Sequence, residues 1–306
     1  MTLQQIKYAI EIYETGNFSR AAKKLYVTQP SLTKAINELE REIGTPIFIR
    51  KKTGIVVTEE GEEFFSYAKQ LYFQYDCLHD RFVLKQKAKK KFAVSCQHYS
   101  FALEAFKDTV KRFDFAEYDF ALREGYTSEV IEDVGSMRSE IGIIFMSSFN
   151  EKFIKKKLDE QNLEFRDLIK CSPYVYVCRN SSLAQQEALS FKDIQDHPCL
   201  IFEQRESDPY FYGEELLPLQ NHSRIIKTHD KLTMLTLIAE LDGYTLNSGL
   251  VYDKVNQNEY VSVPFVSDDD HSAYEVTIGY IKVRNHIVSE LGKLYLDNIK
   301  GILSRK

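Results

Sequence analysis

The chain has 306 residues, of which 43% are hydrophobic, and a formal net charge of −5. This length suits two or three domains with full-sized cores. Its apolar stretches are shorter than a membrane span, it opens without a signal-peptide pattern, and its five cysteines lack C-x-x-C spacing. We therefore expect a soluble, cytoplasmic protein with reduced thiols and no membrane partner.

The charge is distributed unevenly along the chain. Residues 1–58 carry 9 Lys and Arg against 5 Asp and Glu, a net charge of +4, whereas the remaining residues carry −9. A basic head on an acidic body concentrates the attraction for phosphate groups at one end of the molecule.

The first 50 residues predict three short helices. Leu3, Ile6, Ile10 and Tyr13 mark a helix that ends near Gly16. Asn17 and Thr28 are good N-caps for the second and third helices, and Tyr26-Val27 forms the turn between them. The third helix has apolar residues along one face and ends at Gly44. Those apolar residues are Leu32, Ala35, Ile36, Leu39 and Ile43.

Two helices at an angle, the second with polar donors near its N-terminus, form a helix-turn-helix. Spacing alone also fits an ordinary helical hairpin with a solvated outer face. The residue identities in this stretch favour the helix-turn-helix. It contains F-S-R-A-A-K-K-L, then T-Q-P-S-L-T-K-A-I-N-E-L-E, G-T-P-I-F-I-R and V-V-T-E-E-G-E-E-F-F. These motifs closely resemble the winged helix-turn-helix of LysR-type transcriptional regulators.

Residues 47–58 predict a hairpin with a basic tip, the wing of such a domain. Ile47–Arg50 and Ile55–Thr58 are β-prone and flank Lys51-Lys52-Thr53-Gly54. A solvated surface turn would account for the lysines alone, but beside a helix-turn-helix we expect them to contact phosphates. The residues expected to bind DNA, by base edge or by phosphate, are Arg20, Gln29, Pro30, Ser31, Thr33, Lys34, Arg50, Lys51 and Lys52.

A long helix is expected after Thr58, with apolar residues alternately four and three positions apart. This spacing is a narrow seam of the coiled-coil kind, and a single helix cannot bury it alone. We interpret the seam as a dimerisation surface, which the resemblance also implies; the alternative is packing within one chain. The seam residues are Phe64, Ala68, Leu71, Tyr75, Leu78 and Phe82. Lys85 to Lys91 follow as a hinge.

From Phe92 onward strands alternate with helices, which predicts parallel α/β sheets. Strands are expected at Phe92–Ser95, Asp119–Leu122, Glu140–Phe145, Tyr174–Cys178, Cys199–Phe202, Arg224–Thr228, Tyr244–Leu246 and Glu275–Val283, and helices at Phe101–Phe113, Val130–Met137, Lys231–Leu241 and Ile287–Leu303. The resemblance implies a module like a periplasmic solute-binding protein, with two lobes and two crossover segments near Leu163–Lys170 and Val263–Asp270.

The expected organisation is thus α/β with an all-α winged helix-turn-helix head. Residues 1–58 form the DNA-binding domain, 59–91 the linker helix and hinge, and 92–306 the effector-binding domain. Within that domain we assign residues 92–164 and 269–306 to the first lobe and 165–268 to the second. The resemblance implies a homodimer on double-stranded DNA with an imperfect inverted repeat, a tetramer of two such dimers, and RNA polymerase as a candidate further partner.

A small effector, with an anion favoured, is expected between the lobes. Ligands of open α/β sheets bind at the carboxyl ends of strands, beside helix N-termini. Any single residue there could instead simply close a packed surface. The candidates are Ser95, His98, Tyr99, Ser100, Ser147, Phe202, Gln204, Thr245 and Asn247.

Three other functions compete with this interpretation. A redox sensor acting through Cys96 is the alternative, although a reactive thiol must be accessible and usually needs a resolving partner. An enzyme is disfavoured because the sequence lacks a G-x-S-x-G elbow, a P-loop, a zinc signature and a dinucleotide fingerprint. A pure solute-binding protein would leave the basic head without a role. We expect no cofactor, no metal and no catalytic residue.

Overall fold

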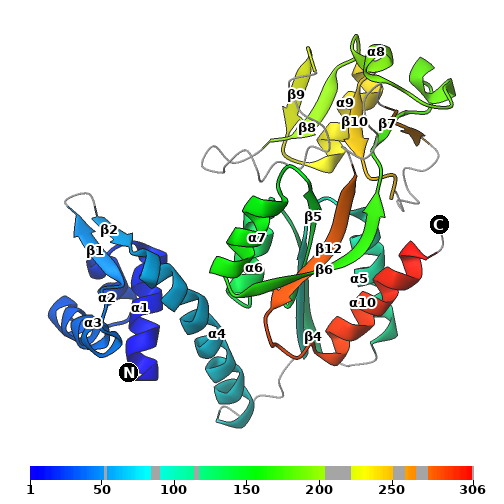
Figure 1. The fold of residues 1–306 in the computed structure, drawn as a ribbon. Coiled ribbons are helices and arrows are strands. Elements are labelled where there is room, and N and C mark those ends of the chain that lie inside the picture. Colours follow the sequence, from blue (N-terminus) through cyan, green and yellow to red (C-terminus); the bar gives the residue numbers. More distant parts are fainter. Residues whose placement is uncertain are drawn as a thin grey trace.

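The computed structural model describes residues 1–51, 54–83, 90–113, 117–203, 222–250, 259–266 and 275–304, without the side chains of residues 77, 80 and 81. These residues form a small helical head, a long helix and two α/β lobes (Figure 1). None of the helices in this described part of the chain combines the length and apolar character that crossing a membrane requires.

The head consists of three helices and a two-stranded ribbon. Its core is a single apolar cluster that includes Ile12, Leu32, Ile36 and Leu39, all fully buried. The elements are α1 (Leu3–Thr15), α2 (Phe18–Lys24), α3 (Gln29–Ile43), β1 (Phe48–Lys51) and β2 (Gly54–Val57).

The predicted helix boundaries of the head are confirmed by their caps. The side chain of Asn17 accepts hydrogen bonds from the N–H groups of Ser19 and Arg20, and that of Thr28 accepts one from Ser31. Gly44 ends α3 in the left-handed conformation, which glycine adopts without steric cost. The buried side of α1 differs from the prediction, since Ile6, Ala9 and Ile12 are its buried residues.

Helix α4 (Glu59–Phe82) leaves the head directly after the ribbon. Its 24 residues correspond to a length of about 36 Å. Thr58 caps it by accepting a hydrogen bond from the N–H of Gly61. A side chain at Gly61 would lie 2.4 Å from the carbonyl oxygen of Ile47, so only glycine allows the helix to start so close to the ribbon. Further along, α4 lies against α6 and α7 of the first lobe.

The first lobe is a five-stranded sheet in the order β4-β3-β5-β12-β6, with helices on both faces. β3 is parallel to β4 and β5, and β12 is antiparallel to β5 and β6. β5 is buried on both sides: Ile143 and Phe145 face the α5 and α10 layer, and Ile144 and Met146 face α6 and α7. The elements are β3 (Lys90–Cys96), α5 (Ser100–Arg112), β4 (Tyr118–Glu124), α6 (Thr127–Gly135), β5 (Ile141–Ser147), α7 (Glu151–Glu160), β6 (Leu163–Cys171), β12 (Val276–Val283) and α10 (Glu290–Leu303).

The second lobe is a five-stranded sheet in the order β11-β7-β10-β8-β9. Strand β8 is parallel to its two neighbours, β9 and β10, and β7 is antiparallel to β10 and β11. Met234 and Ile238 of α9 pack on one face of this sheet. The elements are β7 (Tyr174–Cys178), η1 (Ser182–Gln185), α8 (Phe191–Ile194), β8 (Cys199–Phe202), β9 (Ile225–Thr228), α9 (Lys231–Leu241), β10 (Tyr244–Asn247) and β11 (Tyr260–Pro264).

The C-terminal segment completes the first lobe, as the resemblance implied. Helix α10 packs against α5, where the hydroxyl of Tyr295 donates to the carbonyl oxygen of Ala102 and the amide of Asn298 donates to the hydroxyl of Thr109. Residues from both ends of the effector module therefore share one core.

The first expected crossover is instead a strand. Leu163–Cys171 forms β6, which pairs with β12 along its length, so the predicted lobe boundary at residues 164/165 falls inside a strand. The chain first passes from one sheet to the other between Cys171, the end of β6, and Tyr174, the start of β7. The second predicted boundary, at residues 268/269, lies outside the described residues. Helix α7, rich in lysine and glutamate, and strand β11 were not predicted.

Candidate functional site

The exposed face of α3 is polar and carries the predicted base-contacting residues. Gln29, Pro30, Ser31 and Lys34 are exposed, as are Asn37 and Arg41 further along the helix. The opposite face is buried in the head's core. The hydroxyl of Ser31 lies 2.8 Å from that of Thr28, so it takes part in the cap as well. Thr33 is half-buried and contributes less to this face.

The ribbon is held at a fixed angle to α3 by Glu40. Its carboxylate accepts hydrogen bonds from the N–H groups of Ile47 (2.9 Å) and Phe48 (3.1 Å). Phe48 in turn packs edge-on against Phe18 of α2, and the guanidinium of Arg50 lies 4.2 Å from the centre of the Phe18 ring. A cation on an aromatic face is both attracted and oriented.

The predicted phosphate-contacting residues lie on the surface of the same head. Arg20, Arg50 and Lys51 are exposed, and Lys52 lies outside the described residues. Sequence reasoning assigned Tyr26 only to the turn. The structure shows its side chain 97% exposed beside the start of α3, on a backbone with φ of 55°. A large aromatic residue in the left-handed region of the backbone is unusual.

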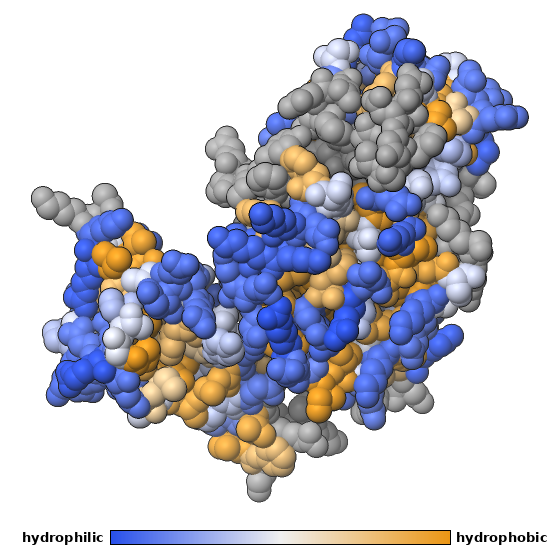
Figure 2. Space-filling view, in the orientation of Figure 1, coloured by the Kyte–Doolittle hydropathy of each residue, from blue (hydrophilic) through white to orange (hydrophobic). Residues whose placement is uncertain are grey.

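The apolar side chains of α4 are packed in the head at the start of the helix and exposed at its end. Phe64 and Ala68, the first two predicted seam residues, pack into the core of their own head. The other four are exposed, including Leu78 (58%) and Phe82 (65%). Figure 2 shows apolar side chains gathered at the far end of this helix. The seam therefore divides into an intrachain half and an apolar stripe of Leu71, Tyr75, Leu78 and Phe82, which we call the α4 stripe.

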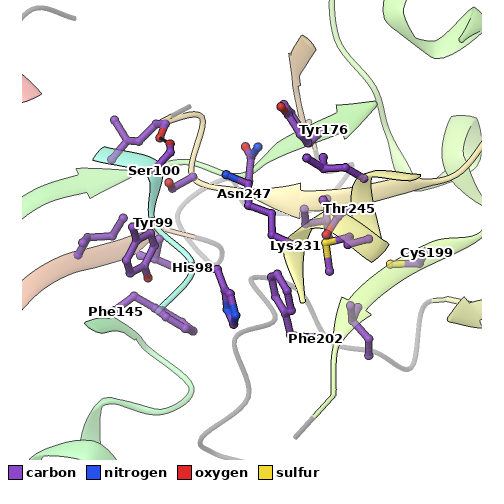
Figure 3. A pocket seen from close by; sticks show the side chains of 18 of the residues that line it. His98, Tyr99, Ser100, Phe145, Tyr176, Cys199, Phe202, Lys231, Thr245 and Asn247 are labelled. Carbon is purple, nitrogen blue, oxygen red and sulfur yellow. Dashed lines mark hydrogen bonds between the residues drawn. The ribbon is translucent and has the colours of Figure 1, made fainter. Parts of the chain in front are cut away.

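A cavity of about 140 Å³ lies between the two lobes (Figure 3). Its walls come from the start of α5 and from β5 and β12 in the first lobe, and from β7, β8, α9 and β10 in the second. The described residues lining it are His98, Tyr99, Ser100, Phe145, Tyr176, Cys199, Ile201, Phe202, His222, Lys231, Met234, Leu235, Thr245, Leu246, Asn247, Ser248, Leu250, Val276 and Ile278.

Two side-chain contacts join the lobes beside this cavity. The rings of His98 and Phe202 stack with their centres 3.7 Å apart and their planes 9° apart. The hydroxyl of Tyr126, just before α6, lies 3.2 Å from Nδ1 of His229, whose Nε2 lies 2.9 Å from the carboxylate of Glu203. Since each contact spans the lobes, each must break or adjust if they rotate apart.

The polar groups in and beside the cavity have different hydrogen-bond partners. His222 lies 2.7 Å from the hydroxyl of Tyr244, and burial lowers the pKa of its imidazole, which favours the neutral form. Burial also raises the pKa of Tyr244, so its hydroxyl stays protonated. The side-chain oxygen of Asn247 accepts a hydrogen bond from the N–H of Gly249. Lys231, the first residue of α9, is half-buried.

Six of the nine predicted effector residues line the cavity. They are His98, Tyr99, Ser100, Phe202, Thr245 and Asn247. Ser147 lies instead in a separate hollow of the first lobe, where its N–H donates to Asn150. Gln204 lies outside the described residues. The sequence did not single out Tyr176, His222 or Lys231, because the approach of α9 and β7 to the first lobe depends on how the two sheets face each other.

Ser95 is a buried structural residue. The strand continues one residue beyond the predicted end, and alternation turns Ser95 toward α6 and away from the cavity. Its hydroxyl donates to the carboxylate of Asp133 (2.6 Å) and lies 2.8 Å from that of Ser139. Asp133 also pairs with Arg138. Gln97, two residues later, links β3 to its neighbours: its side-chain amide donates to the hydroxyl of Thr127, and its side-chain oxygen accepts from the N–H of Phe145.

Cys96 lies on the other face of β3 and is fully buried in the core of the first lobe. Reaction with an oxidant requires an accessible thiolate, so this burial counts against the redox reading. Among the residues that the structure describes, no group of three or more His, Cys, Asp and Glu side chains is placed to hold a metal ion.

Comparisons with known proteins agree with this geometry. The family described as "Bacterial regulatory helix-turn-helix protein, lysR family" matches residues 3–62. The HTH-type transcriptional regulator YvbU of Bacillus subtilis is 22% identical over 214 residues, 69% of each chain. Regulators that are 38–44% identical match over only 65–71 residues, so the chain spans less than half the length of those relatives.

Solved structures match along nearly the whole chain. A full-length OxyR variant from Pseudomonas aeruginosa has a TM-score of 0.61 at 16% identity and covers 98% of both chains. Full-length CbnR complexed with its target DNA has a TM-score of 0.53 at 18% identity, covering 99% of this chain and 100% of that one.

Residues 3–62 therefore form a helix-turn-helix domain of the LysR family. The long helix and the two-lobed α/β module that follow share the fold of the full-length OxyR and CbnR structures.

The Ser95 network makes a testable prediction. Replacing Ser95 by alanine leaves the buried carboxylate of Asp133 short of one hydrogen bond, so we expect the free energy of unfolding to fall by about 1–3 kcal/mol. Urea denaturation measures this change. The control Ser148→Ala, at an exposed position, should stay within about 0.5 kcal/mol of the parent protein. An unchanged transition for Ser95→Ala would show that the network does not stabilise the lobe.

Proposed function

We propose that this protein binds a specific DNA sequence as a homodimer in the cytoplasm and that a small molecule held between its lobes controls the binding. The observation that carries the proposal is the polar face of α3 beside a basic ribbon, on a head joined to the exposed α4 stripe. These features support DNA contact through the head and self-association through the helix that leaves it.

The head offers both kinds of contact that DNA recognition needs. Bases supply specificity and phosphates supply affinity. Gln29 can pair with adenine and Lys34 with guanine in the major groove, where an α-helix fits. Arg20, Arg50 and Lys51 flank this face as phosphate contacts. The complex of CbnR with its target DNA supports the same use of this fold.

The α4 stripe supports a symmetric dimer. Leu71 and Leu78 are seven residues apart, and Tyr75 and Phe82 continue the same side of the helix. Four large apolar side chains on one helix favour burial against a second copy, at about 25 cal/mol per Å² of apolar surface. A dimer presents two heads, so the operator should be an imperfect inverted repeat. Two dimers joined through their effector modules would span two such sites.

The cavity between the lobes supports control by a small molecule. Because His98 and Phe202 come from different lobes, a ligand beside them changes how the lobes sit. The first lobe lies against α4 through α6 and α7. We infer that a shift of the lobes is passed to the heads and changes their spacing on DNA.

Substitutions on α3 test the DNA-binding face. We expect Gln29→Ala and Lys34→Ala each to weaken binding to the cognate promoter fragment by about 1–3 kcal/mol, because each removes a base contact. Titration of the labelled fragment measures the affinity, and circular dichroism checks that the helices are intact. Lys300→Ala on α10 removes the same charge away from the head and should bind normally. Unchanged affinity in both α3 variants would rule out this face.

A charge in the α4 stripe tests the dimer. Leu78→Glu keeps a good helix former but removes buried apolar surface from both protomers and sets like charges together. We expect the dimer dissociation constant to rise at least about a hundredfold in sedimentation equilibrium. Ile287→Glu, at an exposed residue elsewhere, should leave it unchanged. A variant at Leu78 that remains as dimeric as the parent protein would place the interface elsewhere.

A further inference from the structure

The turn between α2 and α3 carries an aromatic side chain that its own chain leaves uncovered. Tyr26 is 97% exposed, the highest value among the large hydrophobic side chains that the structure describes. Figure 1 shows α3, which follows this turn, on the side of the head that faces away from the two lobes. A side chain in this state adds almost no buried apolar surface to the folded protein.

The backbone of this turn suits a different residue type. The φ angle of Tyr26 is 55°, in the left-handed region, where Cβ crowds a neighbouring carbonyl oxygen. The N–H of Tyr26 donates to the carbonyl oxygen of Lys23 (3.2 Å), which helps to hold this conformation. The N–H of Val27 likewise donates to the carbonyl oxygen of Ala22 (3.0 Å). Glycine or asparagine adopts such a backbone with less strain, so Tyr26 costs stability here without compensating burial.

The exposed ring lies close to the polar face of α3. Three peptide bonds separate Tyr26 from Gln29, so their Cα atoms are at most about 11 Å apart. The major groove of DNA is about 12 Å wide, and a phosphate backbone runs along each of its edges. When Gln29 faces a base in the groove, Tyr26 is therefore near enough to meet the backbone at the edge.

The groups at this end of α3 leave room for a further phosphate donor. Pro30 has no N–H, and the hydroxyl of Thr28 is engaged in the cap, 2.8 Å from that of Ser31. Lys23, which is also exposed, brings a positive charge to the same turn. Tyrosine hydroxyls are among the side-chain groups that donate to phosphate oxygens in protein–DNA complexes. Tyr26 therefore has the chemistry, the position and the exposure of a DNA contact.

We propose that Tyr26 contacts DNA: its hydroxyl donates a hydrogen bond to a phosphate oxygen at the edge of the major groove, and its ring lies against the adjoining deoxyribose. This inference rests on the proposed DNA-binding face of α3 and adds a residue to it. Phosphate contacts fix the register and orientation of a protein on the duplex. Tyr26 is thus a positioning residue for the start of α3 and does not itself select bases.

Removing the hydroxyl of Tyr26 tests the contact in the full-length protein. Tyr26→Phe keeps the ring and the turn, and we expect it to bind the promoter fragment about 10-fold more weakly or worse, because each head loses a hydrogen bond to a charged group. Binding to an unrelated duplex should fall by a similar factor, since a phosphate contact carries no sequence information. Tyr118→Phe, at an exposed tyrosine of the first lobe, should bind both duplexes normally.

A second variant separates the contact from the stability of the head. Asparagine adopts the left-handed backbone more readily than tyrosine does. For Tyr26→Asn we therefore expect the midpoint of thermal unfolding to rise by about 1–4 °C, while the affinity for DNA falls at least as far as in Tyr26→Phe. A residue that served only the fold would move stability and affinity in the same direction.

The dependence of affinity on salt distinguishes this contact from that of a lysine. The slope of log K against log salt concentration reports the phosphate charges that the protein neutralises, and the tyrosine hydroxyl is uncharged. Tyr26→Phe should keep the slope of the parent protein, whereas Lys51→Met should lower it by about one unit per head.

Three results would overturn the inference. They are parent-like affinity in both Tyr26 variants, a lower unfolding midpoint together with weaker binding in Tyr26→Asn, and a lower salt slope in Tyr26→Phe. A parent protein that binds no DNA would contradict the proposed function. A parent protein that binds the promoter fragment, with Tyr26 variants that bind it equally well, would contradict this inference alone.

Discussion

The structure depends on one helix, α4, which is buried in the head at its start and exposes a row of apolar side chains at its end. The first turns of α4 place Phe65 and Ala68 in the core of the head, where the Phe65 ring contacts those of Tyr13 and Phe48. The last turns carry the α4 stripe, which this chain leaves exposed. Because a helix is rigid over this length, whatever covers the stripe also fixes the position of the head. In the proposed dimer, self-association therefore also sets the position of the proposed DNA-binding face.

The same reasoning links the head to the effector module. Helix α4 lies against α6 and α7, and α6 begins directly after Tyr126, whose hydroxyl meets His229 of the second lobe. The β-sheet of the first lobe is braced on that side by the buried Ser95–Asp133–Ser139 network. The first lobe therefore behaves as a solid body with the head on one side and the ligand cavity on another. The described contacts between the lobes include the His98–Phe202 stack, the Tyr126–His229 hydrogen bond and the packing of Leu250, which follows β10, in the core of the first lobe.

Local chemistry explains which features the sequence could predict. Asn17, Thr28 and Gly44 act through atoms within a few residues, so the helix boundaries of the head were readable without knowledge of the fold. The strands β7 and β8 were predicted to the residue, because their apolar runs are bounded by polar or turn-forming residues. The cavity residues that closely follow a strand, such as His98 and Ser100, were predictable for the same reason.

What the sequence could not predict depends on contacts between distant segments. Leu163–Cys171 alternates polar and apolar residues weakly and looked like a connection, yet pairing with β12, over a hundred residues later, makes it a strand. Ser95 was assigned to the cavity because the strand was ended one residue early, and a shift of one residue turns a side chain to the opposite face. Lys231 was missed because it meets the other residues of the cavity only where the two lobes face each other.

The spacing of two half-sites on DNA tests the central claim most directly. An operator selected from random duplexes is rebuilt with five base pairs inserted between its half-sites, which rotates one of them by about half a helical turn. If paired α4 helices hold the heads at a fixed separation, the full-length protein binds the parent operator as a dimer and loses most of its affinity for the rebuilt one, and a second insertion of five restores part of it. Equal affinity for all three duplexes, with one protomer bound per half-site, would contradict the account.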